Sequence, residues 1–151
     1  MTPEMQVYIE DVSPGDEIPE LFKNCSPRQL EMWAAASGDF YEIHYDVEYA
    51  REMGLRGLVV HGALKNAFLG HLLLEWVAPL GRITRYACSY RGLDYPGEDL
   101  RCRGKITKVT NHNTEHVAEL DIWIENPRGE TTTPGSAAVV LPSRTEKGTR
   151  T

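Results

Sequence analysis

The sequence has few of the features that mark secreted, membrane-spanning or metal-binding proteins. Its three cysteines, Cys25, Cys88 and Cys102, contain no Cys-x-x-Cys spacing, which argues against a disulfide framework and a zinc ribbon. The most apolar stretch, residues 67–80, is interrupted by polar residues and is too short to span a bilayer. The first residues have neither a basic start nor an apolar core, so no signal peptide is expected. We therefore expect a cytoplasmic protein with no membrane contact.

Positive charge is also scarce, because 16 Lys and Arg residues stand against 22 Asp and Glu residues, giving a net charge of −6. Such an acidic chain is a poor candidate for binding nucleic acid. Residues 82–108 reverse the balance and are rich in Arg and Lys. Solvent-facing strand residues explain this segment, and a site for an anionic ligand is the alternative. The glycine motifs of nucleotide-binding sites are missing, so no nucleotide cofactor is expected.

The length and the apolar content fit one ordinary globular domain. The chain has 151 residues, of which 41% are hydrophobic, which is sufficient for a core without disulfides or metals. Residues 142–151 are polar and lack large apolar side chains. We therefore predict a single domain over residues 1–141 and a flexible tail over residues 142–151.

Three helices are indicated in the first half of the chain. Ser26 and Pro27 suit the start of a helix that ends at Gly38. A short helix is predicted over residues 47–53, after a possible cap at the preceding aspartate. The strongest helical pattern covers residues 61–77, and small residues on one side of it permit close approach of a sheet.

The second half of the chain alternates apolar and polar residues and predicts strands. These strands cover residues 83–90, 100–109, 117–125 and 131–141, and an additional strand is predicted near residues 6–12. The sequence Asn-Pro-Arg-Gly at residues 126–129 is typical of a hairpin turn. A long apolar helix followed by antiparallel strands predicts an α+β fold in which a curved sheet wraps the helix. An exposed edge of that sheet would need cover, which a dimer supplies.

One loop carries the residues best suited to chemistry. Asp39 and His44 lie five residues apart between the first two predicted helices, and His61 and Gly62 lead into the longest helix. An Asp–His pair beside a helix N-terminus suits proton transfer at a carbon next to a thioester or ketone, because the helix N–H groups stabilise an oxyanion. The spacing alone is a weak indication, since a turn aspartate and a packed histidine are common.

The surrounding residues strengthen this interpretation. The string A-S-G-D-x-x-x-I-H-x-D, followed by Y-A-x-x-x-G-L-x-G-L-V-V-H-G-A-L, resembles the MaoC-like family of (R)-specific enoyl-thioester hydratases and dehydratases over residues 13–108. The resemblance implies a hot-dog fold, a curved antiparallel sheet around a long central helix. It also implies a lyase that reversibly adds water to a trans-2-enoyl thioester. No cofactor or metal is expected, because the thioester itself acidifies the α-carbon.

The resemblance assigns roles to particular positions. Asp39 and His44 match the catalytic pair, which would hold one water between them. Gly62 matches the residue whose backbone N–H binds the thioester oxygen. His61 matches a family histidine for which a structural role, capping or bonding the loop, is expected. These positions define the candidate active site, which includes no metal ligand.

The sequence departs from the family at two positions between the catalytic residues. Where the family has Asn-Pro, this chain has Tyr41 and Glu42. The spacing is kept, but the rigid proline and an orienting amide are lost. Tyr41 is expected to orient the loop or shape the pocket. This departure bears on the acyl group more than on the fold.

The resemblance also implies partners. The substrate would be an acyl thioester of CoA or of acyl carrier protein, and the protein would form a homodimer or a higher homo-oligomer, with a heteromer as the alternative. Two other functions stay open at this point. A hot-dog acyl-CoA thioesterase would direct water at the carbonyl instead, and a subunit of a heteromeric enoyl-CoA hydratase would need a second chain.

Overall fold

The computed structural model describes residues 6–112 and 115–146 of the chain. The elements run in the order η1 (Ile9–Asp11), β1 (Leu21–Lys23), α1 (Pro27–Ser37), η2 (Glu42–His44), α2 (Val47–Glu52), α3 (Gly62–Val77), β2 (Arg82–Cys88), β3 (Leu100–His112), β4 (Glu115–Glu125), β5 (Thr131–Val140) and η3 (Arg144–Glu146). The three predicted helices and the four predicted long strands are confirmed within a few residues of their expected ends. No helix in these two ranges is long and apolar enough to cross a membrane.

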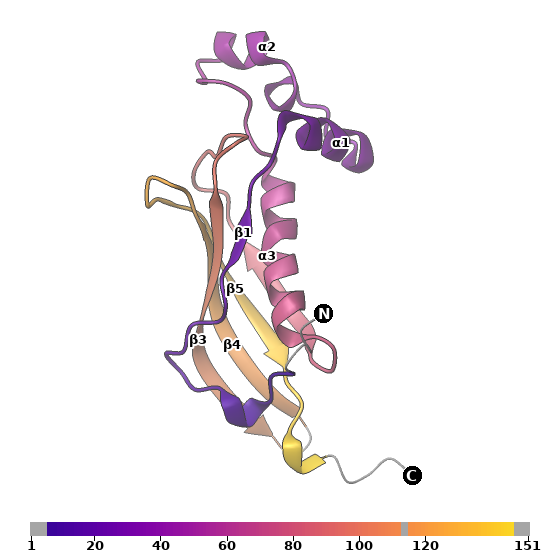
Figure 1. Ribbon diagram of the computed structural model, residues 1–151, viewed down its shortest axis with the longest axis vertical. Helices are drawn as coiled ribbons and strands as arrows, with labels where there is room; N and C mark the ends of the chain where they lie inside the picture. Colours follow the sequence, from indigo (N-terminus) through magenta and orange to yellow (C-terminus); the bar gives the residue numbers. More distant parts are fainter. Residues whose placement is uncertain (1–5, 113–114, 147–151) are drawn as a thin grey trace.

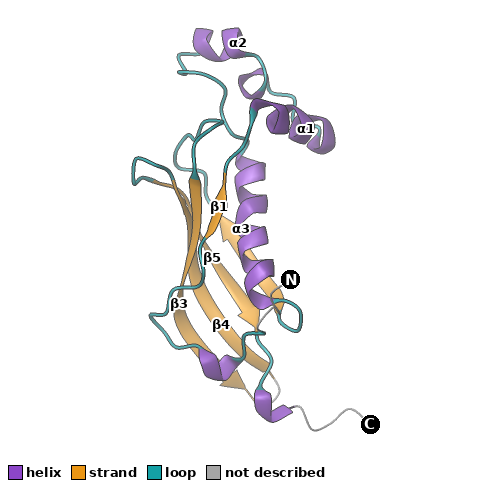
Figure 2. Cartoon of the chain, viewed as in Figure 1, coloured by secondary structure: helices purple, strands orange, loops and turns teal. Residues whose placement is uncertain are grey.

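The strands form one curved antiparallel sheet in the order β1-β3-β4-β5-β2. Helix α3 lies along one face of this sheet, whereas α1 and α2 lie beyond its end, near the start of α3 (Figures 1 and 2). β3, β4 and β5 are joined consecutively, and β2 returns to the far edge beside β5. This is the predicted α+β arrangement of a sheet around a central helix.

The core lies between α3 and the sheet. Its largest fully buried side chains come from both layers: Leu69, Leu72, Leu73 and Val77 of α3, and Ile106, Leu120, Ile122 and Ile124 of the sheet. Each such side chain contributes about 1.5–3 kcal/mol through burial. The predicted small side of the helix also has a structural role, because a Cβ added at Gly70 would lie 2.9 Å from the hydroxyl of Tyr86.

The turn between β4 and β5 follows its predicted chemistry. The side-chain oxygen of Asn126 accepts hydrogen bonds from the N–H groups of Arg128 (3.0 Å) and Glu130 (3.1 Å). Gly129 has a φ of +77°, which side chains other than glycine rarely adopt. The hairpin expected from Asn-Pro-Arg-Gly is therefore confirmed.

The strand predicted over residues 6–12 is wrong. Its centre forms the 3₁₀ turn η1, and the edge strand is instead β1, which pairs with β3. The Asp11 carboxylate accepts a hydrogen bond from the N–H of Tyr8 at 3.0 Å, which closes a turn rather than extending the chain. Ile9 is buried and donates its N–H to the carbonyl of Pro142 at 3.0 Å. Apolar alternation here reflects one anchored side chain, not a strand.

The residues after β5 contact the start of the chain. Ser143 is buried and donates its hydroxyl to Glu10 at 2.5 Å, and Arg144 forms an ion pair with Asp11 at 2.7 Å. Residues 147–151 lie outside the described part of the chain. The domain boundary at residue 141 and the flexible tail therefore stay predictions.

Candidate active site

The end of α1 places Asp39. The helix begins at Ser26, whose hydroxyl oxygen accepts a hydrogen bond from the N–H of Gln29 at 3.2 Å. It ends at Gly38, where a φ of +78° turns the chain out of the helix. The Asp39 N–H then donates to the hydroxyl of Ser37 at 3.3 Å. This hydrogen bond connects the backbone of Asp39 to the end of α1, and Asp39 itself is exposed to solvent.

His44 is buried at the end of η2, and its ring is held by backbone groups. Its Nδ1 lies 2.7 Å from the carbonyl oxygen of Val59. A carbonyl only accepts hydrogen bonds, so Nδ1 carries the hydrogen, and Nε2 of the neutral ring keeps its lone pair. The Val59 N–H in turn donates to the carbonyl of Ile43 at 3.0 Å. These two bonds orient the ring of His44 and leave Nε2 able to accept a proton.

His61 stacks on His44, with ring centroids 3.7 Å apart and an interplanar angle of 19°. It is fully buried, and its Nε2 donates to the backbone carbonyl of Asp39 at 3.3 Å. Its Nδ1 is buried and has no hydrogen-bond partner within residues 6–112 and 115–146. Burial lowers the pKa of His61, and the neighbouring His44 lowers it further. A neutral His61 therefore supports the ring of His44.

The three side chains converge. One carboxylate oxygen of Asp39 and one ring nitrogen each of His44 and His61 lie within 4.8 Å of one another. A separation of this size allows one water molecule to bridge the carboxylate and an imidazole. The donors do not suit a metal ion, because ring nitrogens bind metals in the ring plane and these two planes are nearly parallel. The arrangement favours proton transfer through water.

The start of α3 lies next to this cluster. The first bond of the helical ladder joins the Lys65 N–H to the His61 carbonyl at 3.1 Å. The N–H groups of Gly62, Ala63 and Leu64 precede it and have no intrahelical acceptor. Such a terminus is the positive end of the helix dipole and suits a developing oxyanion. The structure thus brings Asp39, His44 and His61 together beside the start of α3, where Gly62 lies. The roles expected for these residues stay predictions.

Tyr90 is a residue of this region that the sequence did not single out. A Cβ added at Gly62 would lie 2.9 Å from two carbons of the Tyr90 ring. The residue is 53% exposed, so the ring lies at the surface beside the first N–H of α3. Any side chain at position 62 would therefore force the Tyr90 ring to move. Period-two alternation had placed Tyr90 in a strand, but β2 ends at Cys88, and the chain beyond it brings Tyr90 against the first residue of α3.

Tyr41 and Glu42, the two positions that differ from the family pattern, are compatible with the 3₁₀ turn η2 that carries His44. Glu42 is the first residue of η2, a position that suits proline and also suits an acidic side chain at the positive end of a helical turn. The ring of Tyr41 meets His44 and Tyr49 edge-on, each at a centroid distance of 6.2 Å. Aromatic contacts therefore support the loop where the family uses proline, and Tyr41 borders the His44 ring.

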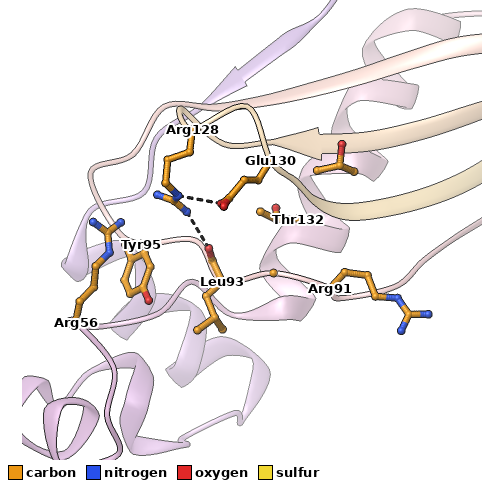
Figure 3. Close-up of a pocket in the computed structure, with 9 residues that line it drawn as sticks. Arg56, Arg91, Leu93, Tyr95, Arg128, Glu130 and Thr132 are labelled. Atoms are coloured by element: carbon orange, nitrogen blue, oxygen red, sulfur yellow. Dashed lines mark hydrogen bonds and ion pairs between the residues drawn. The ribbon is translucent and has the colours of Figure 1, made fainter.

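A separate surface pocket of about 610 Å³ lies against the start of β5 and the loop before β3 (Figure 3). Its lining includes Arg56, Tyr95, Arg128 and Glu130 but none of the residues of the candidate active site. The Arg56 guanidinium lies 3.8 Å from the centroid of the Tyr95 ring, and Arg128 Nε bonds to Glu130 at 2.9 Å. The pocket is therefore not a cluster of unpaired cations.

Glu98 joins the two arginines of this pocket. It forms ion pairs with Arg56 and with Arg128, the latter at 2.5 Å. Burial opposes ionisation of Glu98, but hydrogen bonds from the Tyr95 N–H, Arg128 and Arg56 outweigh it and lower its pKa.

Positive charges in the basic segment 82–108 are also paired with carboxylates, because Arg82 pairs with Glu115 and Arg103 with Glu17. These pairs favour solvent-facing strand residues over an anion site.

Comparison with protein families gives a match over most of the chain. The family described as MaoC like domain matches residues 9–126. A fungal protein named fatty acid synthase beta subunit TOXC, from Cochliobolus carbonum, is 33% identical over 81 residues, which are 52% of this chain. The matched segment is 4% of that curated relative, so the chain corresponds to a small part of it.

Solved structures share the fold. The unliganded R-hydratase PhaJ1 from Pseudomonas aeruginosa matches with a TM-score of 0.81 and 19% identity, covering 92% of this chain and 88% of the other. The ChsH1-ChsH2 complex from Mycobacterium tuberculosis matches with a TM-score of 0.75 and 18% identity, covering 85% and 98%. At these identities the likeness shows the fold alone, and it confirms the predicted hot-dog architecture.

Proposed function

Because this chain belongs to the MaoC-like domain family, we propose that it is a hydro-lyase acting on enoyl thioesters. It adds water reversibly to a trans-2-enoyl thioester and gives the (R)-3-hydroxyacyl thioester. The observation that carries this proposal is the convergence of the Asp39 carboxylate and the His44 ring within 4.8 Å. The substrate is a thioester of CoA or of acyl carrier protein.

The proposed reaction uses one water held between Asp39 and His44. His44 Nε2 takes a proton from this water as the water oxygen attacks the β-carbon of the enoyl group. Asp39 orients the water and relays the proton to the α-carbon. One O–H bond of water and the π bond between the α- and β-carbons break, and a C–O and a C–H bond form. The proton passes from His44 by way of Asp39 to the α-carbon. The Val59 carbonyl supports this role by holding the Nδ1–H of His44 at 2.7 Å, so that Nε2 is the basic atom.

The start of α3 stabilises the intermediate. The N–H of Gly62 binds the thioester oxygen, where negative charge develops as the β-carbon is attacked. The positive end of the helix dipole adds to this stabilisation. His61 keeps the His44 ring in place by stacking at 3.7 Å, and Tyr41 limits the space beside that ring. Neither residue transfers a proton in this scheme.

The sheet supplies a surface for assembly. β2 is an edge strand, and in the described part of the chain its outer edge pairs with no strand. Unpaired backbone groups along a seven-residue edge favour pairing with a second chain. We propose a homodimer through β2. The mass of the purified protein by light scattering checks it, and a monomer that gains activity only with a second chain would favour the heteromer.

The function is tested by following the absorbance of enoyl thioesters. Purified protein is mixed with crotonyl-CoA and longer 2-enoyl-CoAs, with the His44→Gln variant as control and free thiol measured in parallel. We expect absorbance to fall without thiol release, and the control to be inactive. Thiol release would replace the hydratase by a thioesterase. No reaction with any substrate would overturn the stand-alone enzyme.

A further inference from the structure

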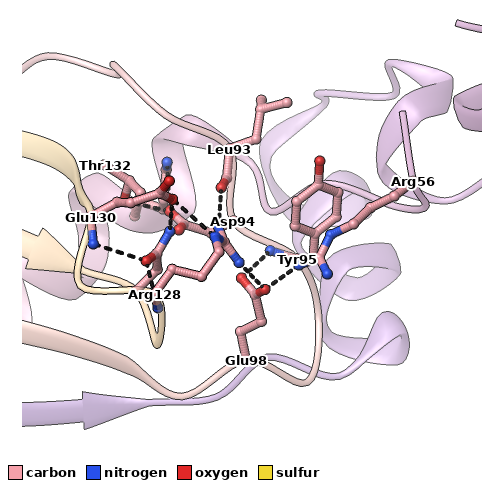
Figure 4. Close-up of polar contacts among 10 residues, drawn as sticks. Arg56, Leu93, Asp94, Tyr95, Glu98, Arg128, Glu130 and Thr132 are labelled. Carbon is pink, nitrogen blue, oxygen red and sulfur yellow. Dashed lines mark hydrogen bonds and ion pairs between the residues drawn. The ribbon is translucent and has the colours of Figure 1, made fainter. Parts of the chain in front are cut away.

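The first turn of α3 buries an ion pair. Lys65 Nζ donates to Asp94 Oδ2 at 2.9 Å and to the carbonyl of Gly92 at 2.8 Å. The hydroxyl of Thr132 donates to the same carboxylate oxygen at 2.6 Å (Figure 4). The side chains of Lys65 and Asp94 are 3% and 0% exposed. These charges are fully removed from solvent.

Stability alone is a weak explanation for this pair. Two buried charges lose their hydration, and an apolar pair of similar volume often stabilises a protein as well or better. A lysine in the first turn of a helix also faces the positive end of the helix dipole. The pair instead fixes geometry, because hydrogen bonds to the Asp94 carboxylate hold the groups that donate them in defined positions.

Asp94 joins three segments of the chain, two through its carboxylate and one through its backbone carbonyl. It bonds to α3 through Lys65 and to β5 through Thr132, and the backbone carbonyl of Asp94 accepts the N–H of Val60 at 2.8 Å. The loop before β3 is fastened to β5 as well, because the Gly92 N–H donates to the carbonyl of Thr132 at 3.0 Å. A Cβ added at Gly92 would lie 3.0 Å from Thr132 Cγ2, so the two segments are in close contact.

Val60 lies among residues that serve the proposed active site. The carbonyl of Val59 holds the Nδ1–H of His44, and the N–H of Gly62 is the proposed oxyanion donor. Residues 59–62 therefore connect the proposed base to the proposed oxyanion site within one short backbone stretch. A displacement of Val60 would move both groups.

We propose that Lys65, Asp94 and Thr132 form a positioning cluster that holds residues 59–62, and through them His44 and the Gly62 N–H, in register for catalysis. This inference rests on the proposed function. None of the three side chains touches the reacting atoms; they act through the Val60 N–H. Misplacement of reacting groups by about 1 Å costs on the order of 10²-fold in rate, so a modest loosening is measurable.

The test compares two neighbouring threonines of β5. Thr132 and Thr133 are 1% and 0% exposed, but Thr133 Oγ1 has no hydrogen-bond partner in the described chain. We expect Thr132→Val to lower kcat about tenfold while KM changes less than about twofold. Thr133→Val is the matched control and should leave both unchanged. Thr132→Ser restores the hydroxyl and should recover most of kcat.

A second readout is the tautomer of His44, followed by ¹⁵N NMR of the imidazole nitrogens. The Nδ1–H form should dominate in the wild type and in Thr133→Val, and Thr132→Val should show a mixture of tautomers. If Thr132→Val loses stability but keeps the wild-type kcat per folded molecule and the wild-type tautomer, the cluster is structural only and the proposal is overturned.

A measurement on the wild type separates this inference from the function itself. The Val60 amide should exchange with deuterium as slowly as amides in the centres of β4 and β5. Faster exchange through local opening would overturn the positioning cluster, even if Thr132→Val failed to fold. If the wild type hydrates no enoyl thioester, the proposed function fails, whereas slow Val60 exchange and a single His44 tautomer would still support the cluster as a holder of residues 59–62.

Discussion

Two clusters of ionisable groups flank residues 59–62, and they differ in access to solvent. Asp39 is exposed, and the adjacent His61 has a buried Nδ1 without a partner in the described chain. Lys65 and Asp94 are both buried, and their charges are directed at each other. An open carboxylate beside an oriented imidazole can meet a substrate, whereas a sealed ion pair can only hold its surroundings. The difference separates the groups proposed to react from the groups proposed to position them.

The largest expected effect is a loss of activity when Asp39 or His44 is replaced. Asp39→Asn and His44→Gln should each lower kcat by about 10²–10⁴-fold, because each removes one proton-transfer group. Asp39 is exposed, so Asn at this position should leave the midpoint of urea unfolding unchanged. Glu42→Gln changes a charge on the same loop and serves as the control, with little loss expected. Near-native turnover in either main variant would remove the pair from the mechanism.

Substitutions in the buried Lys65–Asp94 ion pair should lower the stability of the protein. Lys65→Met leaves the Asp94 carboxylate buried without its counter-ion, and we expect the free energy of unfolding to fall by about 3–5 kcal/mol. Adding Asp94→Leu removes the second charge and should recover most of this loss. Urea denaturation of the single and double variants measures both. A loss below about 1 kcal/mol in the single variant is typical of exposed pairs and would contradict the sealed environment.

The boundary between the two clusters can be probed at Gly62. The Gly62→Ala variant places a Cβ 2.9 Å from the Tyr90 ring, and overpacking of this kind costs about 1–3 kcal/mol. The exposed ring can yield, so the lower end of this range is expected for stability, together with a loss of kcat. A Tyr90→Ala background should relieve the stability cost in a double-mutant cycle. An unchanged cost in that background would mean that the ring is not the obstacle.

The smallest expected effect is a pH dependence from His61. Burial lowers its folded-state pKa below the ordinary 6.5, so the unfolded chain binds a proton at higher pH than the folded chain. The stabilisation from the neutral ring is complete above pH 6.5 and is lost as the pH falls through 6.5 towards the folded pKa. His61→Phe keeps a ring but cannot titrate, so urea midpoints of this variant should fall less between neutral and mildly acidic pH. Parallel pH profiles for the two proteins would exclude His61 as a source.

The sequence predictions were accurate where a feature depends on residues close together in the chain, and they failed where it depends on distant contacts. The helix over residues 62–77 and the turn at residues 126–129 depend on neighbouring residues, and both were predicted. The strand over residues 6–12 was wrong, because the contact between Ile9 and Pro142 cannot be read from local alternation. Lys65 was overlooked, because its partner Asp94 lies 29 residues away.

The sequence by itself determined the order of elements, the apolar central helix and, through its resemblance to a family, the pairing of Asp39 with His44. Helix caps, glycine turns and alternation act over a few residues, so they are legible in one chain. Only the tertiary structure decided which nitrogen of His44 stays basic, which ring lies over Gly62 and which charges are sealed beneath α3. Those properties depend on burial and on hydrogen bonds between distant segments, and these exist only once the chain has folded.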